Sequence, residues 1–178
     1  DGGTVLCATS AVFDVFVTET WLPLSLGRTV VMADESQMLL PAQMAALMET
    51  LHVNVIQLTP SRMRLCLSSK VFREGLAKVG RVLLIGEELT LSLKNAITKC
   101  TGARVINQYG PTEATVLCSF KDVTDETKRI TIGRPDANCR FYALDKQGNQ
   151  ALPCAAGELY IAGPCLALEY IGRADLTA

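Results

Sequence analysis

Short apolar runs separated by helical patterns constrain the fold of this chain more than any other feature of its sequence. The runs are TVVMA (29–33), VNVIQLT (53–59), RVLLIGE (81–87) and ARVINQYG (103–110). Each is rich in Val and Ile and carries apolar residues on both faces of a strand. Such strands are typical of a parallel sheet that is covered on both sides. The sequence therefore predicts a mostly parallel sheet with buried strands.

Apolar residues at helical spacing lie between these runs. They predict helices near 44–51, 60–67 and 93–100, and a further helix over 15–26 that Asp14 would cap. Alternating strands and helices imply right-handed crossovers and an α/β fold with a doubly wound, flavodoxin-like sheet. Ligands of such sheets bind beyond the carboxyl ends of the strands.

The pattern changes after about residue 122. Residues 138–145 and 157–163 have the composition of strands, a turn is expected at 146–150, and no helical pattern intervenes. We therefore expect an α/β subdomain over 1–130 and the truncated start of a β-rich barrel or meander subdomain over 131–178.

Charge and cysteine content exclude several classes of function. A net charge of -1 gives no electrostatic basis for binding nucleic acid, and no apolar run reaches the length that spans a membrane. The seven cysteines are scattered without C-x-x-C spacing, which indicates free, mostly buried thiols in a reducing, cytoplasmic compartment. The lone histidine, His52, is expected to be structural. The ends of the chain suggest a piece of a longer protein.

Two segments carry the functional signal. NQYGPTEATV (107–116) follows a predicted strand, and it is either a strand-ending turn with a solvated Glu or a nucleotide site at the strand's carboxyl end. FDVF (13–16) places the carboxylate of Asp14 among apolar residues, where it needs a charged partner.

Four motifs together resemble the adenylation domains of nonribosomal peptide synthetases, which are adenylate-forming enzymes. They are FDVFVTETWLPLSLGRTVVM, LLIGEELT, NQYGPTEATV and GELYIAGPCLALEYIGRADLTA, in the family's order and at roughly its spacing over essentially the whole chain. The resemblance implies that an amino acid and ATP form an aminoacyl adenylate and pyrophosphate. The acyl group then passes to the phosphopantetheine thiol of a peptidyl carrier protein.

The resemblance also assigns nucleotide roles. Glu113 matches the family's Mg²⁺-binding glutamate, and Thr112 would contact the α-phosphate, so both are candidate catalytic residues. Tyr109 would lie against adenine and Asn107 would hydrogen-bond its edge. Gly110, with the proline after it, would let the backbone approach the phosphates.

A second motif, GEELT (86–90), would line the adenine pocket through Gly86 and Glu88. Glu87 stands where the family more often has a second glycine. The alternative interpretation is a strand-to-helix turn whose acids are favoured by the dipole of the following helix.

In the substrate pocket, Asp14 would pair with the α-ammonium group of the amino acid. The wall around the substrate side chain would comprise Val15, Thr18, Gln57, Leu84, Gly86, Gln108, Val116 and Leu117. This wall carries no charge, so a charged substrate side chain would be left unpaired. We expect a neutral side chain with a hydrogen-bonding group or an aromatic ring.

Several family segments have no counterpart here: the phosphate loop, the ribose-binding Asp and the small C-terminal domain with its catalytic Lys. The chain is therefore expected to be the central, substrate-selecting part of the domain and inactive alone. Residues 167–170 read ALEY where the family has Ala-Arg-Gly-Tyr, and we expect this segment to be scaffold. The alternatives are an acyl- or aryl-acid ligase of the same superfamily, a non-catalytic nucleotide-binding module, or a structural interaction domain.

Overall fold

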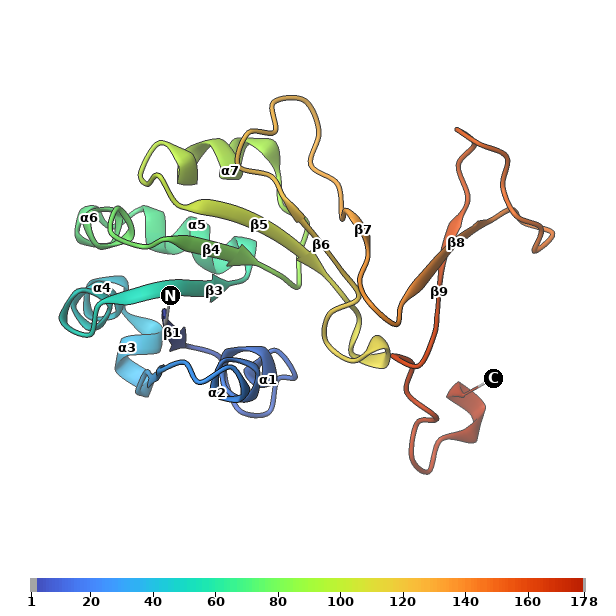
Figure 1. Cartoon of the computed structure of the whole chain (residues 1–178), viewed down its shortest axis with the longest axis horizontal. Helices are drawn as coiled ribbons and strands as arrows, with labels where there is room; N and C mark the ends of the chain where they lie inside the picture. Colours follow the sequence, from blue (N-terminus) through green and yellow to red (C-terminus); the bar gives the residue numbers. More distant parts are fainter. Residues whose placement is uncertain (1–2, 178) are drawn as a thin grey trace.

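The structure, a computed structural model, describes residues 3–177 and is shown in Figure 1. Its strands are β1 (Thr4–Cys7), β2 (Val30–Met32), β3 (Val53–Leu58), β4 (Arg81–Leu84), β5 (Arg104–Tyr109), β6 (Ser119–Asp122), β7 (Arg134–Pro135), β8 (Arg140–Leu144) and β9 (Glu158–Ala162). Its helices are α1 (Phe16–Glu19), α2 (Trp21–Ser25), α3 (Glu35–Leu39), α4 (Pro41–Thr50), α5 (Pro60–Leu67), α6 (Lys70–Leu76) and α7 (Leu91–Thr98). A 3₁₀ turn, η1 (Thr112–Ala114), follows β5. A second, η2 (Ala174–Leu176), is the last element of the described chain.

The main sheet has seven strands in the order β2-β1-β3-β4-β5-β6-β7. The pairs from β2 to β5 are parallel, and β6 and β7 are added antiparallel at one edge. The prediction of a mostly parallel sheet is confirmed. Sequence analysis did not predict β1, β6 or β7.

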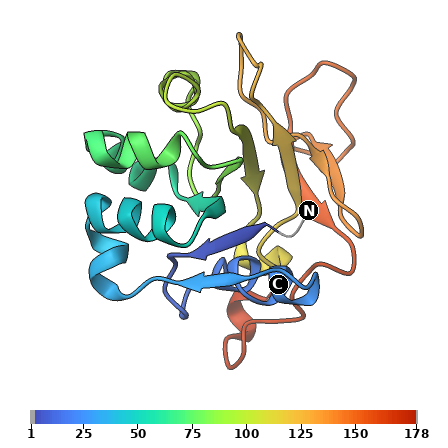
Figure 2. The ribbon, with the colours of Figure 1, turned by 60° about the vertical axis from the view of Figure 1, so that its left-hand side comes forward.

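The sheet is doubly wound, as predicted. The chain passes from β1 to β2 in one direction and then returns across β1 to β3, β4 and β5. Right-handed crossovers in opposite directions place the connecting helices on opposite faces of the sheet. Accordingly, α3–α7 lie along one face, whereas α1 and α2 lie on the other side of β1 (Figures 1 and 2).

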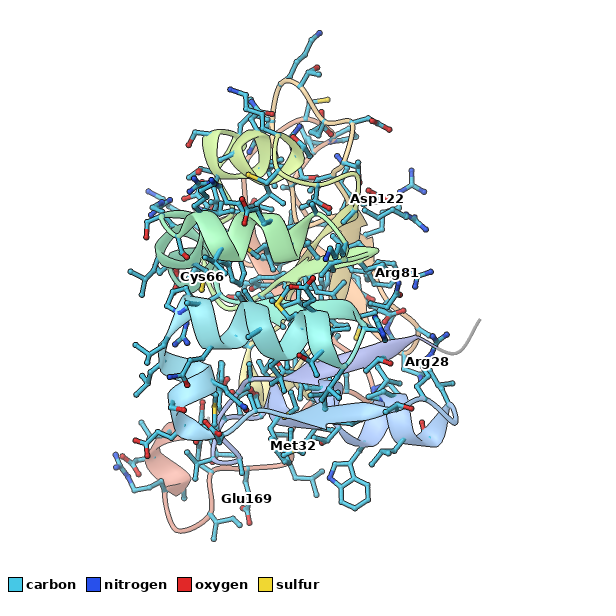
Figure 3. The ribbon with its side chains drawn as sticks, turned by 90° about the vertical axis from the view of Figure 1, so that its left-hand side faces the viewer. Arg28, Met32, Cys66, Arg81, Asp122 and Glu169 are labelled. Carbon is cyan, nitrogen blue, oxygen red and sulfur yellow. The ribbon has the colours of Figure 1, made fainter. Side chains whose placement is uncertain are left out.

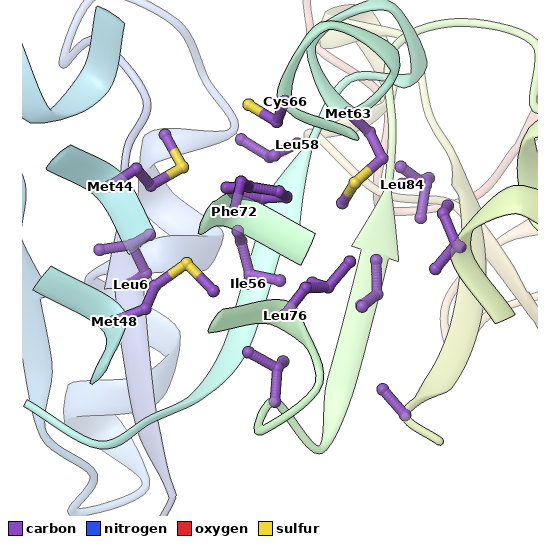
Figure 4. Packing of buried hydrophobic residues seen from close by; sticks show 14 of the residues in the cluster. Leu6, Met44, Met48, Ile56, Leu58, Met63, Cys66, Phe72, Leu76 and Leu84 are labelled. Atoms are coloured by element: carbon purple, nitrogen blue, oxygen red, sulfur yellow. The ribbon is translucent and has the colours of Figure 1, made fainter. Parts of the chain in front are cut away.

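The core lies between the sheet and α3–α7. Leu6, Ile56 and Leu84 project from the strands and pack with Phe72 and Leu76 of α6, and all five are 0% exposed (Figure 4). Side-chain caps begin four of the covering helices. The Asp34 carboxylate accepts a backbone N–H at the start of α3, and the hydroxyls of Thr59, Ser69 and Thr90 do so at the starts of α5, α6 and α7, respectively. The helices predicted near 44–51, 60–67 and 93–100 are confirmed.

The single helix predicted over 15–26 is wrong, because two short helices, α1 and α2, take its place. Thr20 breaks the helix with φ −120° and ψ −73°. Pro23 has no N–H to donate to the carbonyl four residues earlier, so it removes a bond that a continuous helix would need. Val15, not Asp14, occupies the N-cap position of α1, and no side chain caps this helix.

A separate two-stranded antiparallel sheet, β8–β9, extends from the seven-stranded sheet on the right of Figure 1. The strands predicted at 138–145 and 157–163 are therefore confirmed. The seven-stranded sheet continues as far as Pro135, so the subdomain boundary near residue 130 stays a prediction. Between residues 3 and 177, no helix is both long and apolar enough to cross a membrane.

His52 ends α4. Its φ of 51° is left-handed, a conformation that often follows a helix C-terminus and that His tolerates better than most residues. All seven cysteines are free thiols: four are buried, Cys100 and Cys165 are half-buried, and Cys154 is exposed. The structural role expected of His52 and the expected free, mostly buried thiols agree with this arrangement.

Candidate functional site

A cavity of about 580 Å³ lies at the carboxyl ends of β4 and β5. Its volume is within the range usual for small-ligand sites. It is lined by Gly86, Glu87, Glu88, Leu89, Asn107, Gln108, Tyr109, Gly110, Pro111, Arg129, Ile130, Thr131 and Ile132. Five predicted nucleotide-binding residues, Gly86, Glu88, Asn107, Tyr109 and Gly110, therefore lie around one cavity.

The segment 129–132 closes one side of this cavity, and sequence analysis did not predict it. It lies in the connection between β6 and β7. The Asn107 side-chain amide, which is only 5% exposed, donates to the Thr131 carbonyl at 3.0 Å. The only sequence signal was the polar run around Arg129, which carries no motif.

Glycine is required at two positions of the cavity. Gly86 has a φ of +89°, which side-chain-bearing residues rarely adopt. A Cβ on Gly110 would lie 2.3 Å from the carbonyl oxygen of Val116. This close approach holds the chain after β5 against the residues that follow η1.

Glu87 lines the cavity, but its carboxylate is bound elsewhere. It accepts hydrogen bonds from the backbone N–H and the hydroxyl of Ser61, in the first turn of α5. The Ser61 side-chain hydrogen bond is the main cause that lowers the pKa of Glu87. The residue in place of the family's second glycine is thus anchored to a helix N-terminus, where a negative charge is favourable.

Thr112 and Glu113 lie in η1, beside a second cavity of about 360 Å³ that residues 166–170 also line. The Tyr170 hydroxyl donates to a Glu113 carboxylate oxygen and lowers the pKa of that carboxyl. Glu113 and Thr112 are both exposed. A carboxylate and a hydroxyl are hard oxygen donors of the type that Mg²⁺ prefers, so the residues present fit the ion.

The backbone after η1 is strained. Thr115 and Val116 have φ values of 58° and 68°, in the left-handed region that β-branched residues avoid. The Leu117 N–H bonds the Thr115 carbonyl at 2.7 Å, which makes a tight turn centred on Val116. Such strain persists only where the surroundings enforce it, and it clusters at ligand sites.

The predicted substrate segment meets the end of β4 and the turn after η1. Val15, Ile85 and Val116 form a buried cluster, and Leu117 packs against it. The segment that carries Asp14 and the segment 109–117 therefore converge at the carboxyl edge of the sheet.

A hydrogen bond links two predicted wall residues. The Gln57 side-chain amide donates to the Thr18 hydroxyl at 2.9 Å, and that hydroxyl donates to the Val15 carbonyl at 2.8 Å. Gln57 is 2% exposed at the end of β3, so this bond fixes α1 against the sheet.

The prediction that Leu84 forms part of the substrate wall is wrong. Its side chain is 0% exposed in the core under the helices. Leu58 pairs with Leu84 and Gln57 pairs with Leu83, so Leu84 points to the opposite face from Gln57. Ile85, which contacts Val15 and Val116, occupies the position expected of Leu84. Strand alternation counted from Gln57 would have found it.

Two polar groups at this edge have no partner among residues 3–177. The Gln108 side-chain oxygen is buried without a hydrogen bond, and Gln108 lines the larger cavity. The half-buried Asp14 side chain forms no hydrogen bond or ion pair within residues 3–177. A buried acceptor without a partner is uncommon, and a bound ligand is one explanation.

Sequence analysis also missed Glu19, which is 1% exposed. Its carboxylate accepts from the Ala8 N–H at 2.9 Å, the Thr9 N–H at 3.0 Å and the Thr9 hydroxyl at 2.7 Å. Burial raises the pKa of Glu19, although these hydrogen bonds oppose the shift. The carboxylate fixes the loop that leaves the carboxyl end of β1, beside the reversal in strand order.

Comparison with known proteins defines the class that this fold and site represent. Residues 1–171 match the family model described as AMP-binding enzyme. The chain belongs to this family of adenylate-forming enzymes.

Several of its relatives are named as peptide synthetases. Malpibaldin synthetase of Mortierella alpina is 34% identical over 98% of this chain, which is 3% of that protein. A dimodular nonribosomal peptide synthase of Bacillus subtilis is 34% identical over 98% of the chain and 7% of its own length. A four-domain nonribosomal peptide synthetase solved with AMP and glycine bound superposes with a TM-score of 0.89 at 33% identity, over 99% of this chain and 13% of that one. The chain thus spans a small part of the relatives that it matches.

Proposed function

We propose that this chain supplies the amino-acid-selecting and adenine-binding part of an adenylation domain of the nonribosomal peptide synthetase type. The whole domain would convert an amino acid and ATP to an aminoacyl adenylate and pyrophosphate. One observation carries the proposal: Val15, Ile85 and Val116 bury one another beside the cavity that Asn107 and Tyr109 line. The segments proposed to bind the amino acid and the nucleotide therefore lie at the same edge of the sheet.

Adenine would enter the cavity at the ends of β4 and β5. Tyr109 lines it and packs edge-to-face on Phe141, with ring centroids 6.5 Å apart. This contact fixes the ring that would lie against the base. Asn107 keeps a side-chain oxygen for the base while its amide nitrogen is bound to Thr131. Gly86 supplies a turn with positive φ that lines the cavity.

The α-ammonium group of the amino acid would pair with Asp14, which has no partner within residues 3–177. The wall around the substrate side chain would comprise Val15, Thr18, Gln57, Ile85, Gly86, Gln108, Val116 and Leu117. No member of this wall is charged, so we propose a neutral substrate side chain. The unpaired Gln108 oxygen supports one that carries a hydrogen-bond donor.

Thr112 and Glu113 would act on the phosphate side. Glu113 would hold Mg²⁺, which supplies charge neutralisation between the two anionic reactants when bound. The Thr112 hydroxyl would donate to the α-phosphate and stabilise charge that develops there. Tyr170 orients the Glu113 carboxylate through its hydrogen bond.

The partners of the whole enzyme are proposed on the same basis. A peptidyl carrier protein would present the phosphopantetheine thiol that accepts the acyl group. The segments that complete the domain would supply the phosphate loop, the ribose ligand and the catalytic Lys. We place the enzyme in the cytoplasm, which the seven free thiols support.

A chimera tests the proposal. Residues 3–177 replace the matching region of the Bacillus subtilis relative, and ATP–pyrophosphate exchange is measured with each of the common amino acids. We expect exchange with a neutral amino acid. Greatest activity with a charged amino acid would contradict the proposed wall. The chain alone should show no exchange, and robust turnover by it would refute its dependence on the other segments.

The matched variant is Asp14→Asn in the chimera. Loss of the partner of the ammonium group should raise KM for the amino acid about 30-fold, equivalent to about 2 kcal/mol. KM for ATP should stay unchanged. Equal losses for both substrates would assign Asp14 a structural role. Circular dichroism and the melting temperature establish that the variant is folded.

A further inference from the structure

Three cysteines that lie far apart in the sequence converge where the seven-stranded sheet meets β8–β9. Cys118 directly precedes β6, Cys139 precedes β8, and Cys165 follows β9. Cys118 and Cys139 are buried in one apolar cluster, and Cys165 packs against it. Nothing in the proposed reaction uses these thiols.

Cys139 and Cys165 are neighbours across the end of the β8–β9 pairing, in one apolar cluster. The strand pairing explains why, since Arg140 pairs with Ala162 and Cys139 is therefore opposite Gly163, two residues before Cys165. A Cβ on Gly163 would lie 3.5 Å from the Cys139 Cα, so the two chain segments touch at this point.

The pair is accessible to small molecules. Cys139 and Cys165 line the same open cavity of about 260 Å³, together with Thr115 and Pro164. Cys165 is half-buried, whereas Cys139 is buried. A reagent that enters this cavity therefore meets Cys165 more readily.

We propose that Cys139 and Cys165 form a thiol-oxidation site, which a low-molecular-weight disulfide such as oxidised glutathione converts to an intramolecular disulfide. The Cys165 thiolate attacks the glutathione disulfide, forms a mixed disulfide and releases one glutathione thiolate. Cys139 then loses its proton to solvent, attacks Cys165 sulfur and releases the second glutathione. Two protein thiols are oxidised, and one glutathione disulfide is reduced to two thiols.

The second step should be slow at neutral pH. Burial raises the pKa of Cys139 to about 11, so only a small fraction of this group is thiolate. The rate of ring closure should therefore rise with pH, because the thiolate is the nucleophile.

The disulfide would fasten the segment that holds η1. The Thr115 hydroxyl donates to the Cys165 carbonyl at 2.5 Å, and the Ala167 N–H donates to the Glu113 carbonyl at 2.8 Å. A bond from Cys139 to Cys165 would fix this segment to β8 and restrict the turn that carries Glu113. The consequence for nucleotide binding rests on the proposed function, whereas disulfide formation does not.

Oxidation of the folded 178-residue chain tests the site, in a Cys154→Ser background that removes the exposed thiol. After incubation with oxidised glutathione, we expect the intact mass to fall by two hydrogen atoms. Peptide mapping should then link Cys139 to Cys165. The amide exchange of Ala167 should slow after oxidation and recover with dithiothreitol.

Two variants serve as matched controls. Cys139→Ser should stop at the mixed disulfide on Cys165 and gain the mass of one glutathione less two hydrogen atoms. Cys118→Ser removes the third thiol of the cluster and should leave ring closure intact. If either variant fails to fold, mapping in the Cys154→Ser chain still decides the question. No mass change, a mixed disulfide without closure, or a link through Cys118 would overturn the proposal.

Discussion

The α/β region up to Pro135 and the β8–β9 sheet gain their stability in different ways. In the first, strands and helices bury a continuous core that includes Leu6, Ile56 and Phe72, each 0% exposed. In the second, both strands are mostly exposed, and Tyr160 is 48% exposed. The side-chain view in Figure 3 looks onto the helices that cover the first region.

This difference in burial indicates which part of the candidate site is rigid. An isolated two-stranded sheet is marginally stable in water, so β8–β9 depends on its junction with the larger sheet. That junction is the cluster of Ala114, Cys118 and Cys139, against which Tyr109, Phe141, Ile161 and Cys165 pack. Tyr109 also lines the larger cavity, so the weaker region supports part of the site.

Truncation in the core should have the largest effect. Phe72→Ala removes a fully buried ring between α4, α5 and the sheet, and we expect a loss of about 3–5 kcal/mol in the free energy of unfolding. Chemical denaturation checks this value. Phe120→Ala, at a position that is 50% exposed, is the matched control and should cost less than about 1 kcal/mol. Similar losses in the free energy of unfolding at both positions would contradict the expected difference between a buried and an exposed ring.

Glu19→Ala should cause the next largest loss in the free energy of unfolding. It leaves the backbone N–H groups of Ala8 and Thr9 without their acceptor, and we expect a loss of about 2–3 kcal/mol. Glu19→Gln keeps an acceptor oxygen and should lose clearly less. Urea denaturation of the three proteins tests the order, and equal losses for the two variants would show that the hydrogen bonds contribute nothing.

Phe141→Ala should destabilise the β8–β9 sheet and leave the stability of the α/β region unchanged. It removes the ring that packs on Tyr109, and we expect the β8–β9 sheet to lose about 1 kcal/mol of local stability. Hydrogen exchange should accelerate at amides of Tyr142 and Tyr160 and stay unchanged in β3 and β4. Equal acceleration throughout would mean that the molecule unfolds as a single unit.

The pH dependence of stability should trace to the first region. Burial raises the pKa of Glu19 above its usual 4.5, so the folded state holds this proton more tightly than the unfolded state. Its contribution is complete below about pH 4.5 and is lost as the pH rises through the folded pKa. The slope from this group is at most about 1.4 kcal/mol per pH unit. Denaturation of Glu19→Gln across this window should show that slope removed.

The smallest effect is expected at the surface. Arg104 and Asp122 form an ion pair of 2.7 Å with side chains 61% and 37% exposed, and Arg104→Ala should cost less than about 1 kcal/mol. The loss should shrink further at high salt. A salt-independent loss above 2 kcal/mol would show that the pair is structural.

Much of the α/β region was predictable because its signals are local. Val and Ile runs identified β3, β4 and β5, and apolar spacing identified α4, α5 and α7. The continuous helix over 15–26 was wrong, because the break at Thr20 reflects packing and a missing N–H at Pro23 that periodicity does not record. The strands β1, β6 and β7 were not predicted.

The candidate site was predictable in part. Gly86, Asn107 and Tyr109, which the motifs predicted to share a site, line one cavity. The motifs also predicted Leu84 in the substrate wall, but Ile85 is the residue that contacts Val15 and Val116. The error has a physical cause, since a shift of one residue along a strand moves a side chain to the other face. Nothing in the sequence joined Thr131 to Asn107.

The sequence by itself determined the strands and helices of the parallel sheet and the chemical groups at its carboxyl edge, because both depend on neighbouring residues. Only the tertiary structure decided which groups share a cavity, which carboxylate is buried at position 19, and that Cys139 meets Cys165. These outcomes depend on strand register and on contacts between distant segments, and packing of the whole molecule sets them.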